Sequence, residues 1–510
     1  MDAGVHVVGA AQTATTLKRR ALSLGAANAF DYAAQFLLPV VLVRCLDTEA
    51  FGHYRLLWLA AGTVMAFATL AMPASLYYFL PRSDGATKRL YVNQTLVFLV
   101  GAGLIAAWGV SLWNPWLPEK MRGLAGYGVL VPAFVLLWLV ASLLDLLPTV
   151  DERVMWQAKA TVGLATLRTA ALSLTAIATR ELEPILVVLL AFVVFKVVVL
   201  VGYVARQHGL RGPLLRWRTL AGQLRYAAPF GLAGSLYGLR IQADQWLAVA
   251  LFSVGVFASL SIATVLGPLL NLFRQSVNTA FLPSMSRLQA NGDDAGMLEL
   301  NNRANVLVAA LVFPLFAFTF VFAEEIVTIV YTAAYLDAAP LIRVYLVGLA
   351  ANVVETATLT MLLRQGAFML RLNLLVLGLS IAIGWYLALH IGIAGVAVGG
   401  AIAMVFDRVA TLRRIARCTG ITLRRLQDWP ALGLLLLLSV LAAALTWGIV
   451  GRNFLASGPW LRVVLGGVLF TAVYGAVFAS FGGEGLWVKT VGGAKRDAAR
   501  AVGHSPQRAQ

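Results

Sequence analysis

Charged side chains are scarce in this sequence of 510 residues. Asp, Glu, Lys and Arg together make up 12% of it, whereas soluble globular proteins carry about 25%. Hydrophobic residues make up 60%, and the mean hydropathy is +0.82. This composition excludes an ordinary soluble protein and predicts a membrane protein, whose unit of organisation is the membrane-spanning helix.

Cysteine and histidine are also scarce. Cys45 and Cys418 are too few for a disulfide framework, and the five histidines are scattered, so no His/Cys/Asp/Glu cluster has metal-ligand spacing. The sequence lacks a Gly-x-x-x-x-Gly-Lys-Ser/Thr loop, which excludes ATP hydrolysis by that route. We therefore expect neither a metal centre nor a bound cofactor.

Runs of about 20 apolar residues recur along the chain, and a run of this length crosses a bilayer as a helix. Prolines inside such runs predict kinks, because neighbouring helices satisfy the freed carbonyl groups. The sequence predicts an all-α polytopic membrane fold with about 14 transmembrane helices, at residues 22–43, 56–79, 90–113, 126–148, 155–177, 184–204, 226–251, 257–281, 304–322, 341–363, 372–390, 392–411, 431–450 and 462–481.

Basic residues outnumber acidic ones, 40 against 23, which gives a formal net charge of +17. With the N-terminus inside, most of the Lys and Arg residues fall in the inner loops, so the positive-inside rule places both termini in the cytoplasm. The first apolar run has no clear cleavage site, and we expect it to be a retained span. Because topology explains the positive charge, the case for nucleic acid as a partner disappears.

Two short patterns recur at nearly one period. Phe51-Gly52-His53-Tyr54 is echoed by Val254-Gly255-Val256-Phe257, and Leu80-Pro81 by Leu282-Pro283, at offsets of 203 and 202 residues. Six spans separate the copies, so the repeat is parallel, about an axis along the membrane normal. The expected parts are a cytoplasmic segment 1–21, an N-terminal six-helix lobe 22–204, a basic connector 205–225, a C-terminal six-helix lobe 226–411, a basic loop 412–430, two extra helices 431–481 and a cytoplasmic tail 482–510.

Two like bundles that face each other are suited to alternating access through a cavity between them. A large passive anchor is the alternative interpretation of such a repeat. Ionisable side chains inside the spans argue against the anchor, because each costs roughly 2.5–3.5 kcal/mol on insertion scales and needs a partner or a hydrated cavity. The deep ones are Asp31, Arg168, Lys196, Arg240, Asp244, Arg274 and Glu355.

Four predicted spans carry polar residues at steps of three or four, which places them on one helical face. We expect these stripes to line a common hydrated cavity. Arg240 and Asp244 are four residues apart, so they could instead neutralise each other, and Asp145, near a span end, is expected to be interfacial. The stripes are Asn28, Asp31, Tyr32 and Gln35; Tyr237, Arg240 and Asp244; Asn271, Arg274 and Asn278; and Asn352, Glu355 and Thr356.

Cations outnumber carboxylates among the deep ionisable residues, which favours an anionic cargo such as a diphosphate. The carboxylates of Asp31 and Glu355 are predicted to carry a coupling proton or sodium ion, or to hold a cavity arginine in place. The predicted contacts to diphosphate or sugar are Arg168, Lys196, Arg240 and Arg274, with Asp244, Asn271 and Asn278 in the same substrate site.

Several motifs resemble those of the bacterial polysaccharide flippases, the Wzx-like branch of the multidrug/oligosaccharidyl-lipid/polysaccharide exporter superfamily. The similarity covers about residues 18 to 425. The motifs are Arg44-Cys-Leu-Asp-x-x-x-Phe51-Gly52-x-Tyr54, Tyr226-Ala-Ala-Pro229, Phe281-Leu-Pro283, Tyr335-Leu-Asp-Ala-Ala-Pro340-Leu341 and Gly392-Ile-Ala-Gly395-Val-Ala397.

The resemblance implies an inner-membrane secondary transporter, not an enzyme, that flips an undecaprenyl-diphosphate-linked oligosaccharide to the outer leaflet for lipopolysaccharide or exopolysaccharide synthesis. A polysaccharide polymerase and glycosyltransferases are then candidate partners.

Related multidrug exporters place a cation-coupling acidic residue in the first span, where Asp31 is the match. A cation-coupled multidrug exporter is the competing interpretation. A membrane glycan polymerase is less favoured because the longest outer loop, 323–340, is short.

Overall fold

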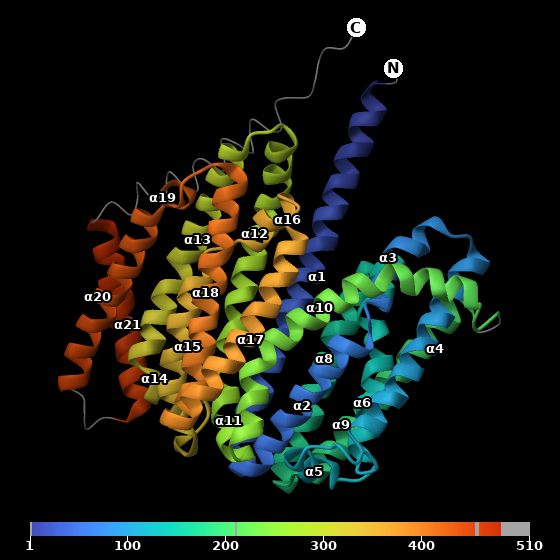
Figure 1. Ribbon diagram of the computed structural model, residues 1–510, viewed down its shortest axis with the longest axis horizontal. Coiled ribbons are helices and arrows are strands. Elements are labelled where there is room, and N and C mark those ends of the chain that lie inside the picture. The colour runs from blue at the N-terminus through green and yellow to red at the C-terminus, as the bar shows by residue number, and fades with distance from the viewer. Residues whose placement is uncertain (1–2, 210–211, 454–457, 481–510) are drawn as a thin grey trace. The chain divides into compact units, whose positions relative to one another are not determined.

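The computed structural model describes residues 3–209, 212–453 and 458–480, and the regular structure of this part is entirely helical (Figure 1). Eleven helices within it are long and apolar enough to cross a membrane, or twelve if the bent pair Thr48–Ala68 and Met72–Arg82 forms one span. The predicted all-α polytopic membrane fold is confirmed.

The chain divides into two compact units, Met1–Ala258 and Ser259–Gln510. The helices of the first unit are α1 (Ala3–Cys45), α2 (Thr48–Ala68), α3 (Met72–Phe79), α4 (Gly85–Gly109), α5 (Glu119–Ala125), α6 (Leu130–Ala141), α7 (Leu147–Val150), α8 (Val154–Thr179), α9 (Leu182–Gln207) and α10 (Trp217–Leu251), with the 3-10 turns η1 (Leu80–Arg82) and η2 (Ser142–Asp145).

The helix α11 (Val254–Ala263) crosses the division between the units. The helices of the second unit are α12 (Leu266–Ala290), α13 (Asp294–Val321), α14 (Ala323–Val330), α15 (Ala338–Asn352), α16 (Ala357–Leu362), α17 (Gly366–Ile391), α18 (Ile393–Thr419), α19 (Leu423–Leu426), α20 (Trp429–Asn453) and α21 (Pro459–Ser480), with the 3-10 turn η3 (Ala333–Tyr335).

Four of the predicted spans are interrupted. The predicted spans 56–79 and 257–281 contain the breaks between α2 and α3 and between α11 and α12. The predicted span 341–363 consists of α15, which ends at Asn352, and α16, which begins at Ala357. The predicted span 126–148 consists of α6, the turn η2 and the short α7. An interruption frees backbone polar groups, which inside a membrane must find partners within the protein.

The structure describes the N-terminal end of the chain from residue 3 onward. The helix α1 begins at Ala3, so the backbone of the predicted N-terminal segment 1–21 continues directly into the first span. The predicted tail 482–510 lies outside the described residues.

The helix α10 packs on the N-terminal unit, against α2 and α3 (Figure 1). Gln223 is fully buried there: it accepts from Gln94 Nε2 at 2.6 Å and donates to Ser75 Oγ at 2.7 Å and Thr95 Oγ1 at 3.0 Å. Farther along, Ser235 Oγ donates to the carbonyl of Ala66 at 2.6 Å. These contacts explain why the units divide beyond α10, although the sequence repeat assigns residues 226–251 to the second lobe.

The two copies of the glycine pattern meet each other. Gly52 on α2 lies so close to Val254 at the start of α11 that a Cβ atom would stand 2.7 Å from Val254 Cγ1, closer than real Cβ contacts. At Gly255 a Cβ atom would stand 3.6 Å from Thr48 Oγ1, an ordinary contact. The pattern that revealed the repeat therefore marks a site of close helix packing.

Replacing Gln223 with Leu should destabilise the protein. The buried groups of Gln94, Ser75 and Thr95 would lose a partner, and each unsatisfied buried polar group costs roughly 1–3 kcal/mol. Thermal unfolding of the purified protein in detergent should show a lower midpoint for Gln223→Leu, whereas the half-buried Gln289→Leu should leave it nearly unchanged. Equal midpoints for both variants would contradict the anchoring role of Gln223.

Gly52→Ala and Gly255→Ala form a matched pair. The methyl group at Gly52 would press on Val254, and overpacking of this kind costs about 1–3 kcal/mol. The methyl group at Gly255 has room, so this variant should unfold at the wild-type temperature or above it, since alanine favours a helix over glycine. An equal decrease of the unfolding temperature in both variants would contradict this explanation, because only Gly52 lies too close to Val254 for a Cβ atom.

Candidate functional site

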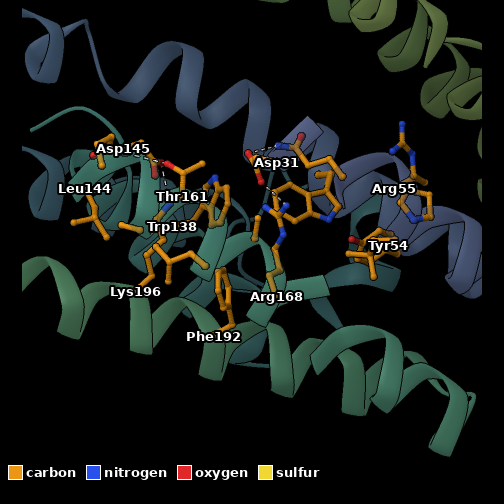
Figure 2. A pocket seen from close by; sticks show the side chains of 18 residues that line it. Asp31, Tyr54, Arg55, Trp138, Leu144, Asp145, Thr161, Arg168, Phe192 and Lys196 are labelled. Carbon is orange, nitrogen blue, oxygen red and sulfur yellow. Dashed lines mark hydrogen bonds and ion pairs between the residues drawn. The ribbon is translucent and has the colours of Figure 1, made fainter. Parts of the chain in front are cut away.

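A pocket of about 350 Å³ lies inside the N-terminal unit (Figure 2). Its walls come from α1, α2, α6, η2, α8 and α9, all of which belong to this unit. The volume falls within the ~300–1000 Å³ range of small-molecule pockets. The charged residues of the lining are Asp31, Arg55, Asp145, Arg168 and Lys196.

The first ion pair of the pocket joins α1 to α8. Arg168 Nη2 lies 3.0 Å from Asp31 Oδ1, and Gln35, one turn after Asp31, donates from Nε2 to Asp31 Oδ2 at 2.8 Å (Figure 2). Both oxygens of the Asp31 carboxylate therefore have a donor. The predicted residues Asp31 and Arg168 come together, and both Asp31 and Gln35 line the pocket.

The second ion pair joins α9 to the interruption after α6. Lys196 Nζ lies 2.8 Å from Asp145 Oδ2 and 4.9 Å from the centre of the Trp138 ring, a cation–π distance. Asp145 is the last residue of the turn η2, so its ion pair with Lys196 stabilises the interruption in this span. The sequence prediction treated Asp145 as interfacial and did not connect it with Lys196.

Aromatic rings form a continuous part of the wall. The rings of Trp58 and Trp138 meet edge to face with centroids 5.0 Å apart, and Tyr54 and Phe192 complete the aromatic lining. Phe134 stands behind both indoles at 5.7 Å from each. Such packing holds the indoles in fixed orientations.

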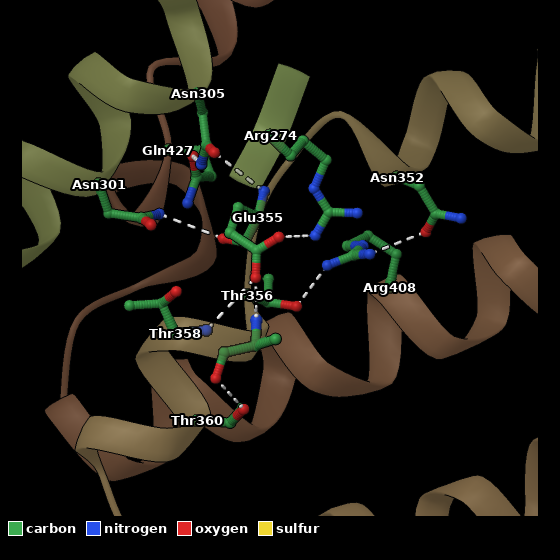
Figure 3. A network of polar contacts seen from close by, with 11 residues as sticks. Arg274, Asn301, Asn305, Asn352, Glu355, Thr356, Thr358, Thr360, Arg408 and Gln427 are labelled. Atoms are coloured by element: carbon green, nitrogen blue, oxygen red, sulfur yellow. Dashed lines mark hydrogen bonds and ion pairs between the residues drawn. The ribbon is translucent and has the colours of Figure 1, made fainter. Parts of the chain in front are cut away.

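A second polar network surrounds the break between α15 and α16 in the C-terminal unit (Figure 3). The Glu355 carboxylate forms an ion pair with Arg274 and accepts from the backbone N–H of Ala357 at 2.6 Å and of Thr358 at 3.3 Å. The Glu355 backbone is also held, because Asn305 Oδ1 accepts from its N–H at 2.9 Å. Glu355 thus stabilises the start of α16 and satisfies groups that the break exposes.

Arg408 bridges the two sides of this break. Its Nη2 donates to Asn352 Oδ1, at the end of α15, at 2.8 Å, and its Nη1 donates to Thr356 Oγ1, just before α16. Arg408 is 8% exposed and therefore buried. The sequence prediction missed its role at the break.

The breaks at Asp145 and Glu355 both carry an acidic residue that forms an ion pair, but the partners differ. Asp145 pairs with Lys196 from α9, whereas Glu355 pairs with Arg274 from α12. Arg408 from α18 donates to Asn352 and Thr356 instead. Cations from other helices therefore stabilise both breaks.

The remaining predicted residues lie on α10 and α12. On α10, Asp244 is buried and Arg240 is half-buried, with its guanidinium carbon 5.4 Å from the centre of the Tyr237 ring. On α12, Asn271 is exposed and Asn278 is half-buried. These helices belong to different units, so the predicted shared cavity between the lobes stays a prediction.

The predicted cationic character is not confirmed for the pocket in the N-terminal unit. Arg168 and Lys196 each lie within 3.0 Å of a carboxylate, and Arg274 in the other unit pairs with Glu355. Among the described residues, no group of three or more His, Cys, Asp or Glu side chains could hold a metal ion.

The aromatic wall and its buried polar neighbours are the pocket residues that sequence reasoning missed. Trp58 and Trp138 give no signal in a span, because tryptophan is common at membrane interfaces and in cores. Gln157 is 4% exposed on α8, and it donates to Thr161 Oγ1 at 3.3 Å. Its position one turn before a second polar residue could have marked the lined face of α8.

The chain is similar to known proteins in sequence and in fold. Residues 41–340 match the family model described as "Polysaccharide biosynthesis protein". No curated protein matches the sequence significantly.

Solved structures with a similar fold include the lipid II flippase MurJ in an inward closed conformation. Its TM-score is 0.69 at 11% identity, covering 90% of this chain and 99% of MurJ. An inward-facing MATE multidrug transporter of the MOP superfamily has a TM-score of 0.58 at 12% identity, covering 77% and 96%. A mutant of the Vibrio cholerae MATE transporter VcmN has a TM-score of 0.53 at 11% identity, covering 82% and 99%.

The family match covers more than half of the chain, and the fold of the chain is similar to those of a lipid II flippase and of MATE transporters. The sequence motifs resembled those of polysaccharide flippases. The chain is a multi-span membrane protein that belongs to the family of polysaccharide biosynthesis proteins.

Proposed function

We propose that this protein is a flippase that moves an undecaprenyl-diphosphate-linked oligosaccharide across the bacterial inner membrane, from the cytoplasmic to the outer leaflet, for surface polysaccharide or exopolysaccharide synthesis. The observation that carries this proposal is the family match over residues 41–340 in a chain that has the fold of the lipid II flippase MurJ. Both termini lie in the cytoplasm in this proposal, in keeping with the basic inner loops.

The polar pocket among apolar helices supports a transport role. Two ion pairs line it, Asp31–Arg168 and Asp145–Lys196, within spans that are otherwise rich in Val, Leu and Ala. A passive anchor gains nothing from charges in the bilayer interior, whereas a carrier of a polar headgroup and glycan needs polar groups there. The polyprenyl tail would remain in the lipid while the polar part crosses.

The proposed reaction is translocation without covalent change. Glycosyltransferases would supply the lipid-linked oligosaccharide, and a polymerase would consume it on the other side. The cation-coupled multidrug exporter is kept as the second candidate because of the MATE-like fold and because Asp31 and Asp145 offer carboxylates beside an aromatic wall.

Asp31 is the better candidate for ion coupling. Its side chain is 29% exposed and lines the pocket, so a proton or sodium ion could reach it. The Glu355 side chain is 5% exposed and holds the start of α16, so charge neutralisation there would release Arg274 and weaken the break. In this proposal Asp31 exchanges Arg168 for the coupling ion, and Glu355 keeps Arg274 in place.

Reconstitution tests the proposed function. The substrate is the lipid-linked repeat unit that accumulates in cells in which this gene is deleted. Proteoliposomes with the wild-type protein should move it between leaflets, and a membrane-impermeant glycosidase measures the outward-exposed fraction. Arg240→Ala, which removes a half-buried cation from α10, should stop this movement while expression persists. A rate equal to that of protein-free liposomes for the wild-type protein would contradict the proposed function, and a normal rate in Arg240→Ala would remove this arginine from it.

Asp31→Asn should remove the dependence of flipping on an imposed proton or sodium gradient. The neutral amide keeps the size of the carboxylate but cannot bind the ion with its charge. Asp84→Asn is the matched control, because Asp84 caps α4 outside the pocket and asparagine caps equally well. Gradient-driven flipping by Asp31→Asn at the wild-type rate would exclude Asp31 from coupling.

A dye-efflux assay tests the second candidate function. Efflux of dye from vesicles without glycan lipid that is lost in Asp31→Asn would favour the multidrug exporter.

A further inference from the structure

The two members of each ion pair in the N-terminal pocket differ in exposure. The side chains of Asp145 and Asp31 are 58% and 29% exposed, whereas those of their partners Lys196 and Arg168 are 6% and 10% exposed. The carboxylates are thus the more accessible members of both pairs. A ligand that reaches these pairs meets the acceptor oxygens more readily than the cations.

This arrangement disfavours a diphosphate in the pocket. A phosphate needs donors, and like charges brought together without full hydration repel each other strongly. To reach Lys196 or Arg168, a diphosphate would have to displace a carboxylate that already lies 2.8 Å or 3.0 Å from the cation. Arg55 is the additional cation of the lining, and it lies on α2, where Figure 2 shows it apart from both ion pairs.

The arrangement also disfavours an organic cation. Both carboxylates of the lining already lie 3.0 Å or 2.8 Å from a cation of the protein, so neither offers an unopposed negative charge to a cationic ligand.

A neutral sugar ring fits the remaining chemistry. Its hydroxyl groups donate to carboxylates and accept from amide and ammonium donors, and its C–H faces pack on aromatic rings. The pocket provides acceptors at Asp31 and Asp145, amides at Gln35 and Gln157, and the aromatic wall of Tyr54, Trp58, Trp138 and Phe192.

We propose that the pocket lined by Asp31, Asp145 and Trp138 binds an uncharged sugar of the glycan, and that the diphosphate binds elsewhere. This inference rests on the proposed function, since it assigns one part of the lipid-linked oligosaccharide to one pocket. Its volume, about 350 Å³, suits a short saccharide. The pocket is therefore a specificity site: glycans that differ in this sugar differ in affinity.

Asp145→Asn is expected to lower the affinity of the pocket for a sugar and to raise its affinity for a phosphate. Loss of the negative charge weakens a hydrogen bond from a sugar hydroxyl, but it removes repulsion toward a phosphate and exposes the charge of Lys196. The test measures binding to the full-length protein in detergent by quenching of tryptophan fluorescence. The two probes are undecaprenyl diphosphate and the lipid-linked repeat unit that accumulates in cells lacking this gene.

We expect Asp145→Asn to bind the repeat-unit lipid roughly tenfold more weakly, and undecaprenyl diphosphate as well as the wild type or better. Trp138→Leu, which keeps an apolar side chain but removes the flat ring, should show the same selective loss and provides the test if Asp145→Asn does not fold. Asp84→Asn is the control for an Asp-to-Asn change outside the pocket.

Three results would overturn the sugar pocket. One is an equal change in affinity for both lipids in Asp145→Asn and Trp138→Leu. Another is tighter binding of both lipids to Asp145→Asn, which would indicate a phosphate in the pocket. The third is competition of a cationic dye with the repeat-unit lipid. Failure of the proposed function is distinguishable, because the wild-type protein would then bind neither lipid.

Discussion

A charge buried among apolar spanning helices must be compensated inside the protein, and this constraint organises the polar structure of both units. Removing one partner from a buried pair leaves an uncompensated charge, which costs about 3–5 kcal/mol. Arg168 pairs with Asp31, Lys196 with Asp145, and Arg274 with Glu355. Each pair joins segments that are distant in sequence, so compensation also determines which helices pack together.

Compensation also operates where two of the spans break. The turn after α6 and the gap between α15 and α16 each carry an acidic residue, Asp145 or Glu355, that pairs with a cation from another helix. Broken spans of this kind are where transporters commonly build their binding sites.

Much of the fold could be predicted from the sequence, because apolar length determines spans and charge asymmetry reflects topology. The stripe of Asp31 and Gln35 was found from its helical spacing, and the structure brings it to the pocket. The breaks were not predicted, because Asp145 lies among leucines and because Asn352, Glu355 and Thr356 were assigned to one face of a continuous helix. The pairing of Lys196 with Asp145 depends on tertiary packing across 51 residues, which periodicity along one helix does not report.

The pocket also shows what a count of charges leaves out. In both of its ion pairs the carboxylate is more exposed than the cation, and each cation already has a carboxylate oxygen within 3.0 Å. Together with the aromatic wall that includes Trp58 and Trp138, this arrangement supports the proposed sugar site. In that proposal the sugar, the diphosphate and the lipid tail of the cargo lie in different places.

Cryo-electron microscopy of the protein in lipid nanodiscs with bound lipid-linked repeat unit tests this account most directly. The account predicts density for a sugar ring against Trp138, with a hydroxyl group within hydrogen-bond distance of Asp145 or Asp31. A phosphate in contact with Lys196 or Arg168 in that pocket, or a bound glycan lipid that leaves the pocket empty, would contradict it.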